Sequence, residues 1–209
     1  MENQYGLIET IKNGISLIYT KLFYSNARLI RLPVYIRGKK KIIFQKGLTT
    51  GYGCRFEAFN IKGSNIQKIF IGSNCKMGDH VHLAAGEKLI IGDNCLMASK
   101  IYISDISHGQ YNGSSFNSSP NESPDQRPLF TQPVHIGDNV WIGENVSILP
   151  GTTIGNGCVI GANAVVNSNI PDNCIAVGIP ARVIKKYSFS EERWIKFSNE
   201  EKQNSEVAK

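Results

Sequence analysis

The sequence lacks the patterns that mark disulfide scaffolds, zinc fingers and membrane-spanning chains. Its 209 residues hold five cysteines, an odd number with no Cys-x-x-Cys pair: Cys54, Cys75, Cys95, Cys158 and Cys174. We therefore expect small core residues in a reducing compartment. No apolar run approaches the roughly 20 residues that span a bilayer, and no secretory apolar segment with a small-residue cleavage site is recognisable. These absences predict a cytoplasmic protein.

Histidine and net charge are also scarce. There are four histidines, and the net charge of +6 is not gathered into one long basic run. The densest basic clusters are "IRGKKK" at 36–41 and "RVIKK" at 182–186. Charge alone leaves a nucleic acid, a phosphate-bearing small ligand and an anionic membrane surface open as partners.

What the sequence does contain is an internal repeat of six residues. From Ile71 it runs "IGSNCK MGDHVH LAAGEK", and after a two-residue slip it resumes as "IGDNCL MASKIY ISDISH". After a long break it continues from Ile136 as "IGDNVW IGENVS ILPGTT IGNGCV IGANAV VNSNIP". An aliphatic residue or Met leads each hexad, and Gly or a small residue usually follows.

A period of six is neither the 3.6 of a helix nor the 2 of a flat strand. It is typical of a solenoid of short strands separated by tight corners, where the leading aliphatic residue points inward and Gly or Asn relieves backbone strain. Stacked coils bury a continuous ladder of Ile, Leu and Val that one coil could not bury alone. The sequence therefore predicts an all-β solenoid.

The segments on either side of the repeats are less regular. Residues 42–61 look like one or two degenerate starting coils, and residues 7–30 have apolar positions at helical spacing, which predicts one or two helices that cap the solenoid. A membrane-surface role for this basic, amphipathic segment is a second interpretation. The stretch "SEERWIKFSNEEKQ" from Ser190 predicts a Ser-capped helical turn and a polar tail. The expected domains are a lead-in at 1–41, the solenoid at 42–186, and a C-terminal helix and tail at 187–209.

The break between the two runs of hexads, 109–133, is rich in Ser, Asn, Pro and Gly and cannot continue the coils. Irregular loops longer than about 12–15 residues are usually functional or disordered. Tyr111, Phe116 and the stretch "RPLF" favour one long extruded loop that is partly packed on a surface. A solvated linker is the alternative.

Four large polar or aromatic residues stand at equivalent places in the repeat. His82, His108, His135 and Trp141 fall at the sixth position of a hexad or just before a new hexad. That position lies beside a corner and next to an inward aliphatic residue. We therefore expect all four side chains on the surface.

The histidines allow a metal site or a general base. A metal needs convergent ligands; His80 and His82 form a His-x-His with no further ligand in sight, so no metal is expected. His108, at the start of the loop, could act as a general base in a cleft that the loop walls, with Asp105 holding the imidazole ring. An ordinary loop residue is the alternative for His108.

Several stretches carry a resemblance to a known family. Residues 134–186, "VHIGDNVWIGENVSILPGTTIGNGCVIGANAVVNSNIPDNCIAVGIPARVIKK", are similar to the C-terminal half of the hexapeptide-repeat acyltransferases, which include galactoside, maltose and xenobiotic acetyltransferases. The stretches "YISDISHGQYNG", "LTTGYGCRFEAFN" and "RLIRLPVYIRGKKKIIF" resemble the O-acetyltransferases of bacterial lipopolysaccharide and capsule, including the polysialate type. The resemblance covers about residues 28–187. It implies a left-handed parallel β-helix, acetyl-CoA as co-substrate, and a homotrimer with active sites between adjacent solenoids.

The resemblance also implies roles for individual residues. His108 matches the histidine that deprotonates the acceptor hydroxyl, and Trp141 matches a tryptophan beside the reacting thioester, where its indole or backbone N–H would steady the oxyanion. An aromatic plug between coils or subunits is the alternative for Trp141. The remaining cofactor positions are Gly143, Glu144, Ala162, Asn167 and Ser168 along the pantetheine arm, and Lys185 near the phosphates, with Arg182 and Lys186 beside it. Many relatives have Thr-Lys in place of Asn167-Ser168. For "IPAR" (179–182), a turn that ends the solenoid is a second interpretation.

The implied activity is acetyl-CoA-dependent O-acetylation of a sugar hydroxyl in a bacterial surface polysaccharide, capsule or O-antigen. Ester formation from a thioester needs the hydroxyl proton removed during attack, a step worth roughly 10²–10⁴-fold, and donors that meet the developing oxyanion. The expected partners are acetyl-CoA and a glycan, without nucleic acid or metal, in the cytoplasm or at the inner membrane. Acetylation of a xenobiotic or a free small sugar and a non-catalytic scaffold are the alternatives; the loop and the basic lead-in favour a glycan.

Overall fold

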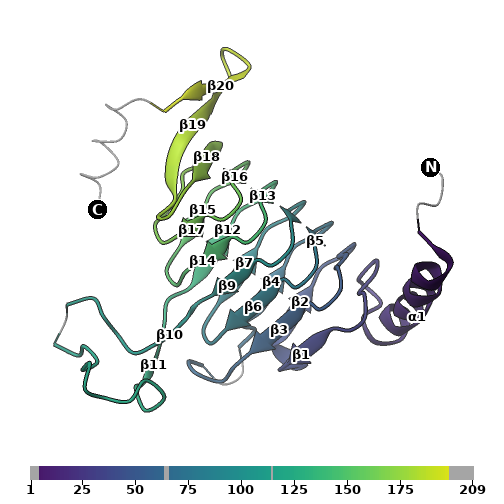
Figure 1. Ribbon diagram of the computed structural model, residues 1–209, viewed down its shortest axis with the longest axis horizontal. Helices are drawn as coiled ribbons and strands as arrows, with labels where there is room; N and C mark the ends of the chain where they lie inside the picture. Colours follow the sequence, from purple (N-terminus) through teal and green to yellow (C-terminus); the bar gives the residue numbers. More distant parts are fainter. Residues whose placement is uncertain (1–4, 64–65, 114, 198–209) are drawn as a thin grey trace.

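The chain winds into a three-faced solenoid of short parallel strands (Figure 1). This computed structural model describes residues 5–63, 66–113 and 115–197. Each full coil visits the three faces in the same order, so that strands from successive coils lie side by side on one face. The β-solenoid predicted from the hexads is therefore confirmed.

Each face is a parallel sheet. The first face holds β1 (Tyr35–Arg37), β3 (Arg55–Ala58), β6 (His82–Ala85), β9 (Tyr102–Ser104), β14 (Ser147–Ile148) and β17 (Val165–Val166). The second face holds β2 (Ile42–Phe44), β4 (Ile69–Ile71), β7 (Leu89–Ile91), β12 (Val134–Ile136) and β15 (Thr153–Ile154). The third face holds β5 (Lys76–Met77), β8 (Leu96–Met97), β13 (Trp141–Ile142), β16 (Val159–Ile160) and β18 (Cys174–Val177).

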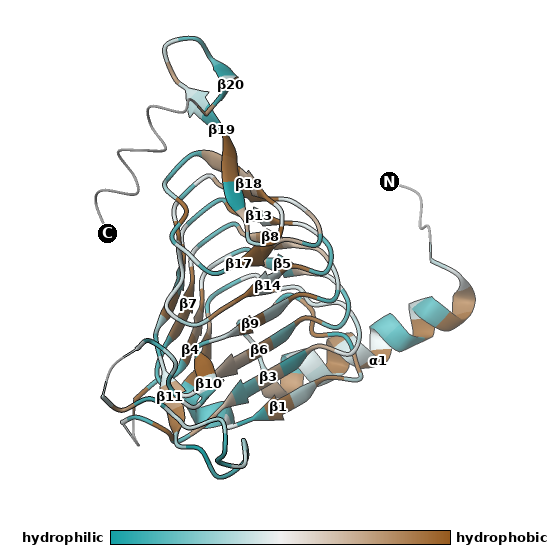
Figure 2. Ribbon diagram, turned by 60° about the vertical axis from the view of Figure 1, so that its left-hand side comes forward, coloured by the Kyte–Doolittle hydropathy of each residue, from teal (hydrophilic) through white to brown (hydrophobic). Residues whose placement is uncertain are grey.

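The core is the stack of residues that lead the hexads. Ile71, Ile91, Ile142 and Ile160 are fully buried, as the inward phase of the repeat predicts. Figure 2 shows the apolar strands stacked along the coils, with polar corners between them. Because each coil supplies only a few core side chains, burial depends on the coils above and below it.

The corners between the second and third faces repeat one design. Asn74, Asn94, Asn139 and Asn173 occupy four of them with positive φ of 57–59°, a conformation that Asn tolerates better than most residues, and Gly157 occupies the corner between β15 and β16 with φ 64°. Backbone N–H groups donate to side-chain oxygens of the next coil, from Ser73 to Asp93 (2.6 Å), from Asp93 to Asp138 (2.7 Å), from Asp138 to Asn156 (2.7 Å) and from Asn156 to Asp172 (2.8 Å). All five cysteines are buried and free, which confirms their expected place in the core.

The lead-in forms one helix, α1 (Leu7–Phe23), which lies beside the first coils (Figure 1). Strand pairing begins before residue 42, because Leu29 bridges Thr49 and β1 pairs with β3. A 3-10 turn, η1 (Lys39–Lys41), precedes β2. No helix within the described residues is long and apolar enough to cross a membrane.

The C-terminal helix predicted from Ser190 is wrong over its described part. A hairpin replaces it: β19 (Arg182–Ser188) pairs antiparallel with β18, and β20 (Arg193–Lys196) pairs antiparallel with β19. The rings of Tyr187 and Trp194 pack in a T-shaped contact across the hairpin, with centroids 5.4 Å apart. Cross-strand pairing and this aromatic contact outweigh the local helical signal. Residues 198–209 of the predicted tail lie outside the described residues.

Candidate functional site

His108 is the last residue of the first strand of a hairpin that leaves the solenoid after the first face. β10 (Ile106–His108) pairs antiparallel with β11 (Leu129–Thr131), with His108 opposite Leu129. Part of the segment predicted as loop is therefore a strand, and the irregular portion projects from the coils beyond it (Figure 1). The His108 side chain is exposed, in agreement with its place in the hexad.

The backbone around His108 is held by residues of the loop itself. The Tyr111 hydroxyl donates to the His108 carbonyl, and Arg127 donates to the Tyr111 hydroxyl over 2.7 Å. The next residue, Gly109, has φ +98°, and its N–H donates to the Pro128 carbonyl over 3.0 Å. The sequence had indicated Tyr111 and the stretch "RPLF", which begins at Arg127, as packed parts of the loop, but not the hydrogen bond between the two residues, because they lie 16 positions apart.

Asp105 does not hold the imidazole ring. Its carboxylate accepts three backbone hydrogen bonds, from Gly86 (2.7 Å), Glu87 (2.8 Å) and Lys88 (2.6 Å), and no hydrogen bond joins it to His108 within the described residues. Burial raises the pKa of the Asp105 carboxyl, while the three N–H groups act in the opposite direction. Asp105 thus braces the neighbouring turn at the foot of the hairpin.

A second brace ties β11 to the coils. The Thr131 hydroxyl donates to Glu87 over 2.8 Å, and Glu87 pairs with Lys62 over 2.8 Å. The hydrogen bond from Lys62 lowers the pKa of Glu87. His108 therefore stands on a hairpin whose foot is fastened at Asp105 and at Glu87.

Trp141 lies on the third face, away from the hairpin. It pairs with Leu96 of β8 and Val159 of β16, and its side chain is 52% exposed. Since Leu96 is also exposed, the indole stands in an apolar strip on the surface of the solenoid. Gly143 follows it at the corner, where an added Cβ would stand 2.6 Å from the Ala162 nitrogen of the next coil.

The predicted site residues occupy two different edges of the solenoid. His108 leaves the edge between the first and second faces, and Asn167 and Ser168 follow β17 at that same edge. Gly143, Glu144 and Ala162 line the edge between the third and first faces. One chain therefore does not bring the two groups together on one edge.

The basic residues predicted for the phosphates lie on the C-terminal hairpin. Arg182 and Lys185 are exposed on β19, and Lys185 pairs with Lys196 of β20. The sequence did not indicate Lys196 as a member of this basic cluster, because its segment was expected to be helical and not to pair with β19. The residues 178–181 connect β18 to the antiparallel β19, so "IPAR" does form the turn that ends the parallel coils.

The remaining histidines have other surroundings. His80 occupies a corner with φ 57°, and His82 pairs with the buried Glu57 over 3.0 Å, which also accepts from Arg55 over 2.5 Å. Within the described part of the chain, no group of three or more His, Cys, Asp or Glu residues is arranged to hold a metal ion.

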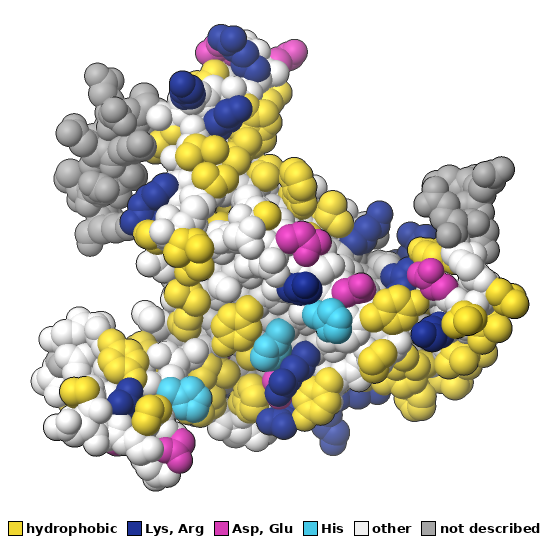
Figure 3. Space-filling model, viewed as in Figure 1, with side chains coloured by type: hydrophobic (Ala, Val, Ile, Leu, Met, Phe, Trp, Pro, Cys, Tyr) yellow, Lys and Arg dark blue, Asp and Glu magenta, His cyan; other side chains and the backbone are white. Residues whose placement is uncertain are grey.

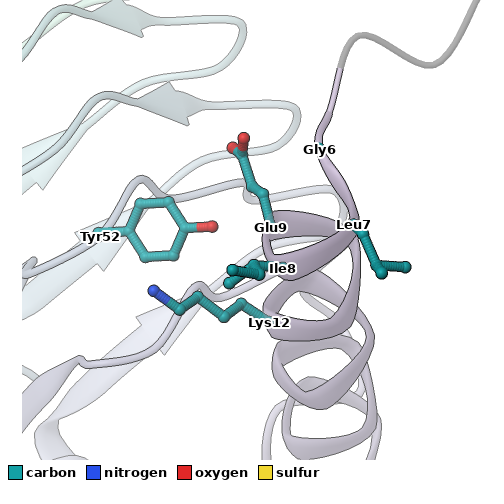
Figure 4. A pocket seen from close by; sticks show the side chains of 6 residues that line it. All are labelled: Gly6, Leu7, Ile8, Glu9, Lys12 and Tyr52. Atoms are coloured by element: carbon teal, nitrogen blue, oxygen red, sulfur yellow. The ribbon is translucent and has the colours of Figure 1, made fainter.

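A large groove lies at the first coils of the solenoid, where the His80 N–H donates to the carbonyl of the groove residue Tyr52 over 2.8 Å. Its volume is about 720 Å³, and it lies between the start of α1 and the second coil, lined by Gly6, Leu7, Ile8, Glu9, Lys12 and Tyr52. In Figure 4, Glu9 and Lys12 extend toward Tyr52, while Leu7 points away. None of the predicted site residues borders this groove.

Comparison with known proteins identifies the family. Residues 133–168 match the model of the bacterial transferase hexapeptide repeat. The chain is 44% identical over 196 residues, 94% of its length and 97% of the relative's, to WbbJ of Escherichia coli (strain K12), named as a candidate lipopolysaccharide biosynthesis O-acetyl transferase. This chain belongs to the hexapeptide-repeat acyltransferases. The predicted membership and enzyme class are thereby confirmed.

Solved structures of the family share the fold. A hexapeptide-repeat acetyltransferase from Vibrio cholerae has 25% identity and a TM-score of 0.50, with 68% of this chain and 71% of that one covered. A galactoside acetyltransferase in complex with coenzyme A has 23% identity and a TM-score of 0.53, with 94% and 90% covered. The family's solenoid is a left-handed β-helix, as the resemblance implied.

Proposed function

We propose that this acyltransferase moves an acetyl group from acetyl-CoA to a sugar hydroxyl of a bacterial surface polysaccharide, with His108 as the general base. The observation that carries the proposal is the position of His108, exposed at the end of a braced hairpin beside a long projecting loop. The relationship to WbbJ supports the acceptor class. A projecting loop gives an extended acceptor a surface to lie against.

The reaction needs few groups. The His108 imidazole takes the proton of the acceptor hydroxyl as the oxygen attacks the thioester carbon. The tetrahedral intermediate then collapses, the C–S bond breaks, and the departing thiolate of coenzyme A receives the proton. General-base assistance of this kind is worth roughly 10²–10⁴-fold. No covalent enzyme intermediate is required.

The third face offers a binding surface for acetyl-CoA. Trp141 and Leu96 form an exposed apolar strip suited to the pantetheine arm, and Gly143 keeps the adjacent corner narrow. Beyond β18, Arg182, Lys185 and Lys196 present positive charge suited to the nucleotide phosphates. Asn167 and Ser168 lie on the other edge, so their contact with the cofactor would come from a neighbouring copy.

A homotrimer would unite the two edges. If three solenoids pack side by side, the hairpin of one chain faces the third-face edge of the next, and each interface receives one His108 and one Trp141. We therefore propose an active site at each interface. The separation of the two residue groups on one chain supports this arrangement.

The test is release of coenzyme A from acetyl-CoA in the presence of candidate glycans. His108→Ala should lower kcat by roughly 10²–10⁴-fold without changing the thermal midpoint, because the side chain is exposed. His135→Ala, on β12 of the second face, is the matched control and should keep wild-type kcat. Wild-type kcat in His108→Ala would refute the general base, and turnover on free sugars or drugs but not on glycans would favour the alternative acceptors.

A further inference from the structure

The helix α1 turns its polar side toward the solenoid and its apolar side toward solvent, the opposite of a helix that packs on a core. Its polar side contacts the solenoid: the Thr20 hydroxyl accepts from the Ile30 N–H over 2.8 Å, and the Ser16 hydroxyl accepts from the Leu32 N–H over 3.1 Å. Ser16 and Thr20 are its buried residues. The Arg31 guanidinium also donates to Asn13 over 3.0 Å.

The opposite side is a continuous apolar stripe. At 3.6 residues per turn, its members fall within an arc of about 100°, and all six are exposed: Leu7, Ile8, Ile11, Ile15, Ile18 and Leu22. Exposure reaches 78% at Leu7 and 72% at Leu22, so the stripe is uncovered over the whole helix. Figure 3 shows hydrophobic side chains gathered over α1. Soluble chains rarely leave so large an apolar surface without a partner.

Positive charge surrounds this stripe. Lys12 and Lys21 flank it, each about 90° from its centre on opposite sides of the helix, and Lys39 of η1 donates to the Phe23 carbonyl at its end. Residues 1–41 contain eight Lys and Arg against two Glu, whereas the other 168 residues contain fifteen of each sign. The whole net charge of +6 therefore belongs to the segment that carries the helix.

We propose that α1 binds an anionic phospholipid surface, with the stripe among the acyl chains and the lysines at the headgroups. A helix with an apolar face flanked by lysines and a positive surrounding is the arrangement that lies in a membrane interface. The charge favours this occupant over a second copy of the chain, because two such segments would repel each other.

The test uses vesicles of phosphatidylcholine, alone or with about 30 mol% phosphatidylglycerol, and co-sedimentation of the full chain. Wild-type protein should bind the anionic vesicles, more weakly at high salt. Ile11→Asp/Ile18→Asp should weaken binding at least about tenfold, and Lys12→Gln/Lys21→Gln about fivefold per lysine. Ile66→Asp is the matched control, because Ile66 is as exposed as Ile15 (60% and 56%) but lies outside α1; it should bind like wild type.

Two further measurements exclude loss of the helix and a change of oligomeric state as causes of weaker binding. Ile15→Trp adds a fluorophore in the stripe to the native Trp141 and Trp194. The emission of the added residue, taken as the difference between the variant and wild type, should shift to shorter wavelength on anionic vesicles, independently of any loss of helix in the Asp variant. Sedimentation velocity should show the same oligomeric state for wild type and Ile11→Asp/Ile18→Asp. Unchanged emission, equal binding by the Asp variant, or a smaller oligomer in that variant together with no vesicle binding would overturn the proposal; the last result would make the stripe an interface between copies.

Discussion

The two edges that flank the second face of the solenoid are built differently. At the edge shared with the third face, most coils repeat an Asn of positive φ and a backbone-to-side-chain bond to the next coil, as from Ser73 to Asp93. At the edge shared with the first face, the chain leaves the coils through β10 and returns through β11, and Asp105 closes the gap with three bonds.

The two edges have different roles: the regular edge stabilises the fold, and the interrupted edge presents the candidate catalytic residue His108. The regular edge distributes the closing interactions over many exposed, equivalent corners, so no single corner carries much of the free energy of unfolding. The interrupted edge concentrates them in one buried carboxylate, which is what allows a long loop and His108 to stand outside the coils. Substitutions at matched residues of the two edges test this contrast.

The largest effect is expected from removing the carboxylate at the interrupted edge. Asp105→Ala leaves three backbone N–H groups without their acceptor, that of the buried Gly86 and those of the more accessible Glu87 and Lys88. A buried orphan costs about 1–3 kcal/mol, so the free energy of unfolding should fall by about 2–3 kcal/mol. Asp93→Ala at the regular edge removes one exposed bond and should cost under about 1 kcal/mol. Denaturant titration of both variants measures the contrast, and equal losses would contradict it.

A methyl group added at a glycine should lower stability at the regular edge and activity at the interrupted edge. At Gly92, on the regular edge, a Cβ would stand 2.7 Å from the Gly137 backbone carbon, and Gly92→Ala should destabilise the fold by about 1–3 kcal/mol. At Gly109 it would meet side chains of the loop, Ser118 and Tyr111. Gly109→Ala should therefore lower kcat, by moving His108, more than it lowers the thermal midpoint. A variant that unfolds without a selective loss of kcat would argue against the division.

The smallest effect is a pH-dependent one on the first face. Burial would raise the pKa of Glu57, but hydrogen bonds from Arg55 and His82 outweigh it and leave the pKa lowered. A carboxyl with a lowered folded-state pKa contributes stability above its ordinary pKa and loses it as pH falls through the lowered value. Glu57→Gln should thus have a lower thermal midpoint than wild type near neutrality, with the gap closing below about pH 4. A gap that is constant with pH would rule out the ionised pair as its source.

The hexads predicted the solenoid because their information is local. The leading residues such as Ile91 and Ile142 and the corner cysteines such as Cys95 mark inward positions through a fixed period. The same frame predicted that His108 and Trp141 face solvent, which the structure confirms for both.

What the sequence missed depends on contacts between distant segments. β10 and β11 pair across a loop: β11 belongs to no hexad, and β10, although it ends the hexad "ISDISH", leaves the coils there. Arg193–Lys196 was expected to be helical because only its pairing with β19 makes it a strand. The guess that Asp105 orients the imidazole relied on spacing, whereas its side chain turns to Gly86 in the preceding coil. The edge that each site residue occupies depends on where its coil stands in the repeat. The irregular loop interrupts the repeat, so the sequence did not predict the division of the site between two edges.

The most direct test of the shared site mixes two inactive proteins. Chains with His108→Ala and chains with Trp141→Ala are co-expressed with different tags, and trimers that carry both tags are isolated. Each such trimer has one interface with both residues intact, so it should recover about one third of wild-type turnover, while either parent alone stays inactive. Mixed oligomers as inactive as their parents would contradict a site divided between neighbouring chains.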